Sequence, residues 1–315
     1  MEQDDLERYR GELTGYCYRM LGSAFDAEDA VQETLIRAWR GVDRFENRSS
    51  PRTWLYRIAT NVCLDALESS RRRARPMALT APASNPTGPG AAWDDTALIE
   101  PLPDARLKAA DTDPEVVATA RETVRLAFIA ALQHLPAKQR VALLLCEVLG
   151  FSVREVAEFQ ETTVAAVNSA LQRARATLAA RVDAPAPPAE DVQRALAARY
   201  ADAFARYDMD ALTMLLHVDA TLSMPPYTTW LRGHADIQAW LTGPAIGCRG
   251  SRLIPTLANG SPAFGQYRPA PDGGHDPWAL QVLETSGSRI TAISFFRDTP
   301  RLFPLFNLPA RLAPG

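Results

Sequence analysis

The sequence predicts a multidomain protein with two all-α helical domains followed by a C-terminal α+β domain, on three observations. Apolar residues recur at helical spacing over residues 4–67 and again over residues 113–182. Residues 76–114 between these stretches are rich in Pro, Ala, Gly, Ser and Thr and show no apolar period, as is typical of a linker. Beyond residue 190, helical stretches precede strand-like runs that Gly, Pro and Asp turns separate.

The first domain, residues 1–75, is expected to contain three helices. The first helix covers about residues 4–21. The second begins at Asp26, a suitable N-cap, and runs to about Gly41. The third begins at Pro51, a residue suited to the first helical position. The apolar stripe expected for the second helix is Ala27, Ala30, Val31, Thr34, Leu35, Ala38 and Trp39.

The second domain, residues 115–183, is also predicted to be helical. One helix covers residues 138–149 and ends at Gly150, a natural residue after a helix C-cap. Ser152 and Glu155 have the spacing of a capping box, which predicts that another helix starts there. The buried stripe expected for the last helix of this domain is Val164, Val167, Leu171, Ala174 and Leu178.

The C-terminal domain, residues 190–310, follows a short proline-rich linker. Helical periodicity is expected over about residues 191–207, 210–216 and 235–241. Strand-like runs lie at residues 219–224, 253–257, 263–267, 278–284 and 289–296. Helices followed by an antiparallel meander predict an α+β fold.

The charge of the chain is segregated, although the net charge is only −3. Residues 37–75 hold ten arginines and four acidic residues, whereas residues 76–120 hold two basic and seven acidic residues. A basic segment beside an acidic one is typical of a protein with a nucleic-acid-binding surface. The near-neutral total therefore hides a feature that favours a nucleic-acid partner.

The third helix of the first domain carries the chemistry of a nucleic-acid contact. Trp54 is an aromatic anchor there, and a polar loop precedes the helix. Outward residues expected on the helix are Thr53, Tyr56, Arg57, Thr60, Asn61 and Asp65. Asn and Thr side chains suit base edges, whereas Arg and aromatic groups suit phosphates and base stacking, so single-stranded nucleic acid is favoured. A solvated helix face with a basic tail accounts for the composition equally well.

The end of the second domain is typical of a helix-turn-helix, in which the second helix enters the major groove of DNA. Its outward residues are expected to be Ala165, Ala166, Asn168, Ser169, Gln172, Arg173 and Arg175. Asn and Gln can pair bidentately with adenine, and Arg with guanine. An αα-hairpin within a helical bundle is the alternative, and the side-chain types favour DNA.

Other classes of protein are disfavoured. Cys17, Cys63, Cys146 and Cys248 form no C-x-x-C pair, so neither a zinc site nor a disulfide scaffold is expected. The chain has no apolar run of membrane-spanning length and its charged N-terminus is unlike a signal peptide. We therefore expect a cytoplasmic protein without metal, cofactor or membrane partner.

Four motifs resemble one family. FDAEDAVQET at residues 25–34, followed by Ala38 and Trp39, resembles region 2.2 of the extracytoplasmic-function (ECF) sigma factors of the sigma-70 family. RTWLYRIATN at residues 52–61 resembles their region 2.3–2.4. HLPAKQR at 134–140 and VAAVNSALQRAR at 164–175 are similar to region 4.

The resemblance implies a specificity subunit that binds core RNA polymerase and promoter DNA. The β′ clamp would receive Asp29, Gln32, Glu33 and Arg37, and the β flap is the second contact expected on polymerase. The −10 element would be bound by Phe45, Glu46, Asn47, Arg48, Ser49, Trp54, Arg57, Asn61, Arg71, Arg72 and Arg73. The −35 element would be bound by Lys138, Arg140, Thr163, Asn168, Ser169, Gln172, Arg173 and Arg175.

Two further residue-level expectations follow from the same resemblance. The acidic linker, residues 76–114, would thread through polymerase toward its RNA exit channel. Glu161 stands in the turn before the last helix, where many members of the family have glycine, so the turn geometry at this position is in question.

The C-terminal domain resembles the SnoaL-like polyketide-cyclase group, in the order of its elements and in SMPP at 223–226 before WLRG at 230–233. Acid–base candidates are His217, Asp219, His234 and Asp236, for which surface or capping roles are favoured, so no catalytic residue is assigned. We expect this domain to regulate the sigma factor, with a small ligand as a candidate signal. The alternative is a helix-turn-helix regulator, or a fusion whose C-terminal domain is a cyclase- or isomerase-like enzyme.

Overall fold

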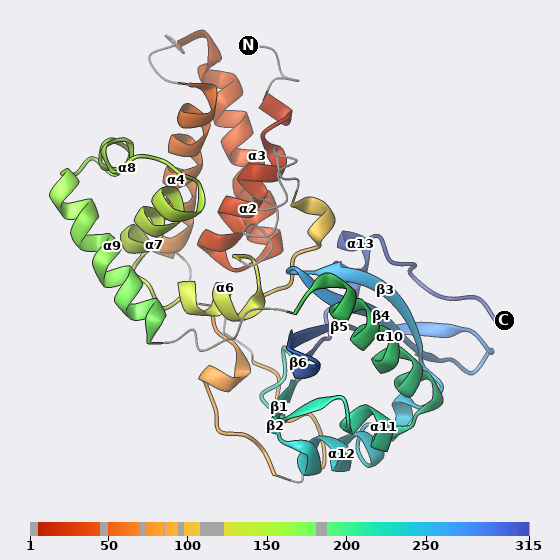
Figure 1. The fold of residues 1–315 in the computed structure, drawn as a ribbon. Helices are drawn as coiled ribbons and strands as arrows, with labels where there is room; N and C mark the ends of the chain where they lie inside the picture. The colour runs from red at the N-terminus through yellow and green to blue at the C-terminus, as the bar shows by residue number, and fades with distance from the viewer. Residues whose placement is uncertain are drawn as a thin grey trace. The chain divides into compact units, whose positions relative to one another are not determined.

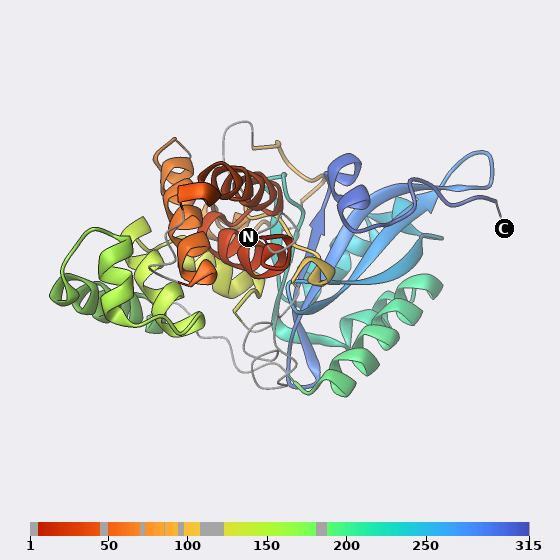
Figure 2. The same ribbon diagram turned by 90° about the horizontal axis from the view of Figure 1, so that it is seen from above.

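The computed structural model describes residues 6–44, 50–69, 73–84, 86–93, 98–107, 123–180 and 188–314. The chain forms two compact units. The helical unit comprises residues 1–74 and 99–183, and the C-terminal unit comprises residues 75–98 and 184–315. Figures 1 and 2 show the helices of the first and the mixed helices and strands of the second. The fold class predicted from the sequence is confirmed.

Three long helices open the helical unit: α2 (Arg10–Leu21), α3 (Ala24–Gly41) and α4 (Pro51–Ser69) (Figure 1). The cap of α3 is Ser23, whose Oγ accepts a hydrogen bond from the Asp26 N–H, so the helix begins earlier than the predicted Asp26. Most of the predicted apolar stripe of α3 is buried. Trp39 is the exception, because its side chain lies 61% exposed, and its assignment to that stripe was wrong.

Two residues predicted on the outer face of α4 are buried instead. Tyr56 and Thr60 have no exposed surface, and the Tyr16 hydroxyl is hydrogen-bonded to the Thr60 hydroxyl at 2.8 Å. The physical reason is that α4 packs against α2 and also against α7 (Ala137–Leu143), so it is covered on more than one side. The face of α4 available to a partner is therefore narrower than periodicity alone indicates.

The second set of helices comprises α6 (Leu126–Leu132), α7, a π turn η4 (Leu144–Val148), α8 (Val153–Phe159) and α9 (Val164–Ala179). The capping box of Ser152 and Glu155 is confirmed, and Gly150 has the left-handed φ of 72° expected after a helix end. Val164 was predicted to be buried but is 45% exposed, because it occupies the first turn of α9.

The segment predicted as a flexible linker is packed over much of its described length. Residues 75–98, with a short 3-10 turn η2 (Pro76–Ala78), belong to the C-terminal unit. Residues 99–107, with η3 (Asp104–Arg106), belong to the helical unit, where Ile99 and Leu102 are buried. The carbonyl of Glu100 accepts a hydrogen bond of 2.8 Å from the Tyr18 hydroxyl. Backbone and side-chain contacts thus hold this sequence despite its irregular composition.

The C-terminal unit is built on a six-stranded sheet of order β2-β1-β6-β5-β4-β3. The strands are β1 (Leu216–Ser223), β2 (Trp230–Arg232), β3 (Arg252–Ala258), β4 (Ser261–Pro269), β5 (His275–Ser286) and β6 (Arg289–Phe296). β1 and β6 pair in parallel and the other neighbours are antiparallel. The five predicted strands are confirmed, and the three-residue β2 was not predicted because it is too short to show alternation.

Helices cover both faces of this sheet (Figure 2). The main core forms with α10 (Glu190–Arg206), α11 (Met209–Thr213) and α12 (His234–Thr242), which is followed by the turn η5 (Ile246–Cys248). The apolar C-terminal tail forms α13 (Thr299–Leu305) and packs on the other face, where Phe303 meets Tyr267 edge to face with ring centroids 5.1 Å apart. The tail is therefore part of the domain's packing.

One residue in the turn of the helix-turn-helix has a left-handed backbone conformation although it is not glycine. Glu161 has φ 49°, a conformation that is costly for a residue with a Cβ atom. We predict that Glu161→Gly raises the free energy of opening of α8 and α9 by about 0.5–1 kcal/mol, since the relief of strain exceeds the added chain entropy of glycine. Amide hydrogen exchange of these helices measures this. Gln160→Gly, at a residue of φ −91°, is the control and should destabilise them; a loss of protection in Glu161→Gly would contradict the prediction.

Candidate promoter and polymerase interfaces

The first candidate surface lies on α4. Trp54, Arg57 and Asn61 are spaced by three and four residues and so lie on one helical face. Arg57 and Asn61 are exposed. Trp54 is half-buried, and its indole lies close to Gly41 at the end of α3. This surface combines an anchored ring with an amide and a guanidinium, which suits an unstacked base beside a phosphate.

Part of the predicted −10 set falls outside the described residues: Phe45, Glu46, Asn47, Arg48, Ser49, Arg71 and Arg72. Arg73 is described, and its side chain contacts two carboxylates of the helical unit. Its guanidinium donates to Asp26 at 2.6 Å and lies 4.0 Å from Glu100. The contact of Arg73 with DNA stays a prediction, and in this arrangement nearby carboxylates balance its charge.

The second candidate surface lies on α9, where Thr163 caps the helix by accepting a hydrogen bond from the Ala166 N–H at 3.1 Å. Exposed residues along this face are Thr163, Val164, Asn168, Gln172, Arg173 and Arg175, with Ser169 half-buried. Arg173 donates to the Ser169 hydroxyl at 2.6 Å, and Arg175 pairs with Glu147 at 2.5 Å. Val164 was missed as a contact residue, and its exposed methyl groups suit the methyl group of thymine.

Lys138 and Arg140, both predicted to hold −35 phosphates, have different surroundings. Lys138 is exposed at the start of α7. Arg140 is only 4% exposed and donates to the carbonyls of Met20 and Leu135 and to the Gln133 side chain. The prediction for Arg140 is corrected: its guanidinium is buried where α7 packs against α2, so it cannot reach a phosphate in this arrangement.

The third candidate surface lies on α3. Asp29, Gln32 and Arg37 are exposed, and Glu33 is half-buried and paired with Arg37 at 2.6 Å. Arg37 also lies 3.4 Å from Asp65 of α4. Trp39 follows Gln32 by seven residues and therefore lies on the same side of the helix. An exposed tryptophan among charged residues is typical of an anchor for a protein partner. Trp39 was not predicted as a contact residue, because its spacing placed it in the apolar stripe of the helix.

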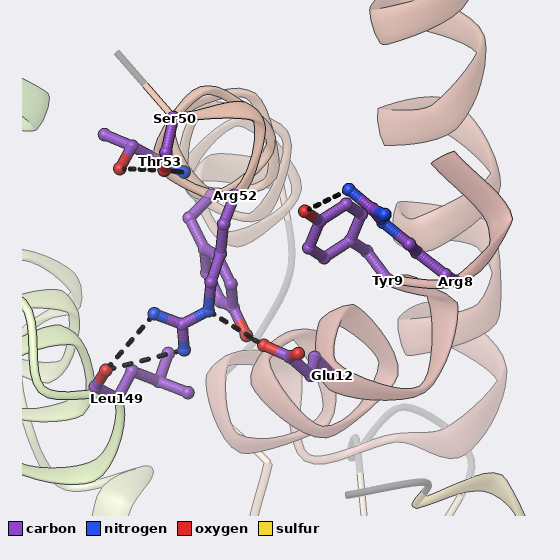
Figure 3. A network of polar contacts seen from close by, with 8 residues as sticks. Arg8, Tyr9, Glu12, Ser50, Arg52, Thr53 and Leu149 are labelled. Carbon is purple, nitrogen blue, oxygen red and sulfur yellow. Dashed lines mark hydrogen bonds and ion pairs between the residues drawn. The ribbon is translucent and has the colours of Figure 1, made fainter. Parts of the chain in front are cut away.

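A network around Arg52 connects α4 to the helices that precede the helix-turn-helix (Figure 3). Its Nε donates to Glu12 of α2 at 3.0 Å, and its two terminal nitrogens lie 3.5 Å from the carbonyl oxygen of Leu149. The guanidinium also lies over two rings, 5.0 Å from the centroid of Tyr56 and 4.9 Å from that of Phe151. One side chain thus contacts both sets of helices.

Aromatic packing extends the same contact. The rings of Tyr56 and Phe151 meet edge to face with centroids 5.3 Å apart, and Phe151 meets Phe159 of α8 at 5.5 Å. Burial raises the pKa of Tyr56, so its hydroxyl stays protonated and donates to Glu12 at 3.3 Å. The two sets of helices are therefore joined through a buried aromatic row.

The histidines among the acid–base candidates of the C-terminal unit contact backbone groups: His217 Nδ1 accepts from the Asp219 N–H at 3.2 Å. Asp219 is exposed and paired with Arg232 at 3.2 Å. The His234 ring contacts the carbonyl oxygens of Leu216 and His217. Within the described residues, no group of three or more His, Cys, Asp or Glu side chains could hold a metal ion. Over the same residues, none of the helices is long and apolar enough to cross a membrane.

Comparisons with known proteins match this arrangement. A family model of Sigma-70 region 2 matches residues 6–73, and one of Sigma-70, region 4 matches residues 125–178. The ECF RNA polymerase sigma factor SigG of Mycobacterium tuberculosis is 46% identical over 97% of this chain and 83% of its own length. SigJ of the same organism is 30% identical over 71% of this chain and 64% of its own. The crystal structure of SigJ aligns with a TM-score of 0.63 and 25% identity over 98% of this chain and all of that one.

Proposed function

The chain belongs to the ECF sigma factors of RNA polymerase, and from this premise we propose that α4 and α9 read the two elements of a promoter. Members of this family bind core RNA polymerase and direct it to promoter DNA. The observation that carries the proposal is that both polar helix faces lie on helices matched by region 2 and region 4. Because polymerase and promoter are cytoplasmic partners, we propose that the protein acts there.

At the −10 element, Trp54, Arg57 and Asn61 would bind the melted strand. The indole of Trp54 offers a stacking platform, Arg57 offers a charge for the backbone and Asn61 offers an amide for a base edge. The residues before α4, Phe45, Glu46, Asn47, Arg48 and Ser49, with Arg71 and Arg72 after it, complete the set proposed on family grounds. Stacking and charge together suit a single strand better than a duplex groove.

At the −35 element, the first turns of α9 would enter the major groove. Asn168 and Gln172 can recognise adenine, Arg173 can recognise guanine, and the exposed Val164 can contact a thymine methyl group. Thr163, Ser169, Arg175 and Lys138 would position the helix by polar and phosphate contacts. Arg140 is left out of this set because its guanidinium is buried.

On the polymerase side, we place the β′ clamp against α3, with Trp39 added to Asp29, Gln32, Glu33 and Arg37. The indole would supply apolar area, and the surrounding charges would fix orientation. The second domain would meet the β flap. These contacts are specific to a polymerase subunit, and a sigma factor is a non-enzymatic initiation protein, so the cyclase- or isomerase-like alternative is set aside.

We propose that the C-terminal domain regulates promoter binding by the helical domains, and that it does so by holding the linker. Within the C-terminal unit, backbone hydrogen bonds join the linker to residues 226–230. The Ala83 N–H donates to the carbonyl oxygen of Trp230, and the Trp93 N–H donates to that of Pro226. In the other direction, the Thr228 N–H donates to the carbonyl oxygen of Ala91. The indole Nε1 of Trp230 donates to Thr80 at 3.0 Å. These bonds hold part of the connection between the two helical domains.

Linker length turns this docking into a constraint on promoter binding. Elements at −10 and −35 are about 25 base pairs apart, or about 85 Å along the duplex. If residues 99–107 stay on the helical unit, the connection from Leu107 to Thr123 spans at most about 55 Å at about 3.5 Å per residue, which is shorter than this separation. Release of the docked segments would lengthen the connection and so favour binding of both elements together. We infer that the C-terminal domain sets how readily this release occurs.

Promoter opening tests the −10 proposal. We predict that Trp54→Ala combined with Asn61→Ala lowers open-complex formation by about tenfold or more, since one lost base stack costs ~1–3 kcal/mol. Run-off transcription and permanganate footprinting on genomic fragments, with purified core polymerase, measure this, and fluorescence anisotropy measures core binding, which should not change. Glu68→Ala on the same helix is the matched control. Failure of the wild-type protein to initiate on any genomic fragment would sink the proposed function.

Linker release tests the regulatory proposal. Gly90 has φ 76°, and a Cβ atom there would lie 2.5 Å from Thr228 Oγ1, so Gly90→Ala should displace the segment. Gly88→Ala is the matched control, because a Cβ atom at Gly88 meets nothing within 4 Å. We predict that Gly90→Ala and a deletion from residue 186 onward change transcription several-fold while core binding persists. Equal transcription in wild type and both variants would contradict regulation by this domain.

A further inference from the structure

The C-terminal unit contains a cavity of about 280 Å³, close to the lower end of the ~300–1,000 Å³ range of small-molecule sites. It lies between α10, α12 and strands β4, β5 and β6, and one wall comes from the linker. Its described lining comprises Thr87, Gly88, Pro89, Phe204, Met224, Tyr227, Trp240, Leu241, Pro244, Ala245, Cys248, Arg268, Trp278, Phe295 and Arg297. Five of these residues are aromatic, which favours a flat or apolar ligand body.

Two arginines give the cavity its charge. The guanidinium carbon of Arg268 lies 3.8 Å from the ring centroid of Trp278, and that of Arg297 lies 3.6 Å from it, so both cations stack on the same indole. Arg268 donates to the Gly247 carbonyl at 2.5 Å, and Arg297 donates to the Trp278 carbonyl at 2.9 Å. In the described part of the chain, no carboxylate forms an ion pair with either guanidinium. Burial lowers the pKa of Arg297.

This charge pattern favours an anion. Like charges repel more strongly in a partly buried site than in water, and each guanidinium has donors beyond its carbonyl contact that can bind a ligand. Stacking on Trp278 stabilises the positions of the arginines but does not neutralise them. A carboxylate would do so by accepting paired N–H bonds from a planar guanidinium.

The linker supplies the wall that closes the site. Thr87, Gly88 and Pro89 line the cavity, and the Thr229 N–H donates to the carbonyl of Pro89 at 3.3 Å. The flanking bonds of residues 83–93 hold this wall in place. None of the described lining residues is His, Asp or Glu, so the cavity offers binding rather than carboxylate or imidazole acid–base chemistry.

We infer that this cavity binds a small aromatic or apolar carboxylate, with Arg268 and Arg297 on the acid group and the aromatic side chains around the body. The linker wall closes over the bound molecule. The inference goes beyond promoter recognition, and binding can be measured without polymerase, so its failure is distinct from failure of the proposed function.

Two probes of one shape test the charge requirement: 2-naphthoate and its neutral isostere 2-naphthamide, titrated into the full-length protein by calorimetry. We expect naphthoate to bind at least about tenfold more tightly, with quenching of tryptophan fluorescence. Arg297→Gln and, separately, Arg268→Gln should abolish this preference. Arg252→Gln, an exposed arginine on β3 outside the cavity, is the matched control and should keep it.

Two separate cavity variants are used so that misfolding of one does not prevent the test. Circular dichroism reports whether each variant retains its secondary structure. No binding of naphthoate to the wild type, equal affinities for the two probes, or a preference that survives in both folded arginine variants would overturn the inference. Loss of the preference in Arg252→Gln as well would also overturn it, because the effect would then be one of net charge.

Discussion

The contact of Arg52 with Glu12, Leu149 and the rings of Tyr56 and Phe151 is the constraint on which the arrangement of the helical unit depends. It joins the start of α4, which carries the proposed −10 surface, to the turn that leads into α8 and α9. A cation–π contact is worth ~0.5–2 kcal/mol, and an aromatic pair ~0.5–1.5 kcal/mol beyond its burial. The sum is large enough to favour one arrangement of the helices and small enough for a binding partner to overcome.

This contact is incompatible with simultaneous binding of both promoter elements by the proposed surfaces of α4 and α9. The sixteen residues of α9 make a helix about 24 Å long. With α4 and Phe151 in direct contact, two surfaces on these helices cannot reach elements about 85 Å apart. Binding to polymerase and promoter must therefore select a state in which the contact is broken, and the partners need to bind that state only a few kcal/mol more favourably. The docked linker would add to the same barrier, and this is the physical means by which we propose that the C-terminal domain regulates transcription.

Local sequence signals were sufficient for the elements and for the family. Apolar spacing located the helices, alternation located the longer strands, and the capping box at Ser152 marked the start of α8. These features depend on neighbours in the sequence. The polar residues Asn61, Asn168 and Gln172 were likewise placed on exposed faces, because spacing alone determines which face of a helix a residue occupies.

Errors arose where distant segments decide a residue's surroundings. Tyr56 and Arg140 are buried because two sets of helices pack together, and no local period reports that packing. The ion pair of Arg73 with Asp26 was not predicted, because Asp26 lies far back in the sequence. Trp39 was predicted in the core because an aromatic residue at helical spacing is usually buried, whereas here it is exposed. The linker lacked any period, yet backbone bonds to residues 226–230 hold it in place, and such bonds leave no trace in composition.

The opening of the helical unit is tested most directly by single-molecule energy transfer between dyes on α4 and α9, at cysteines introduced at the exposed Glu68 and Ala176. High transfer efficiency is expected for the free protein, with a lower value for Phe151→Ala. On assembly with core polymerase and promoter DNA, we expect a separation of more than about 60 Å, in keeping with the spacing of the two elements. An efficiency that stays high in the initiation complex would contradict the account.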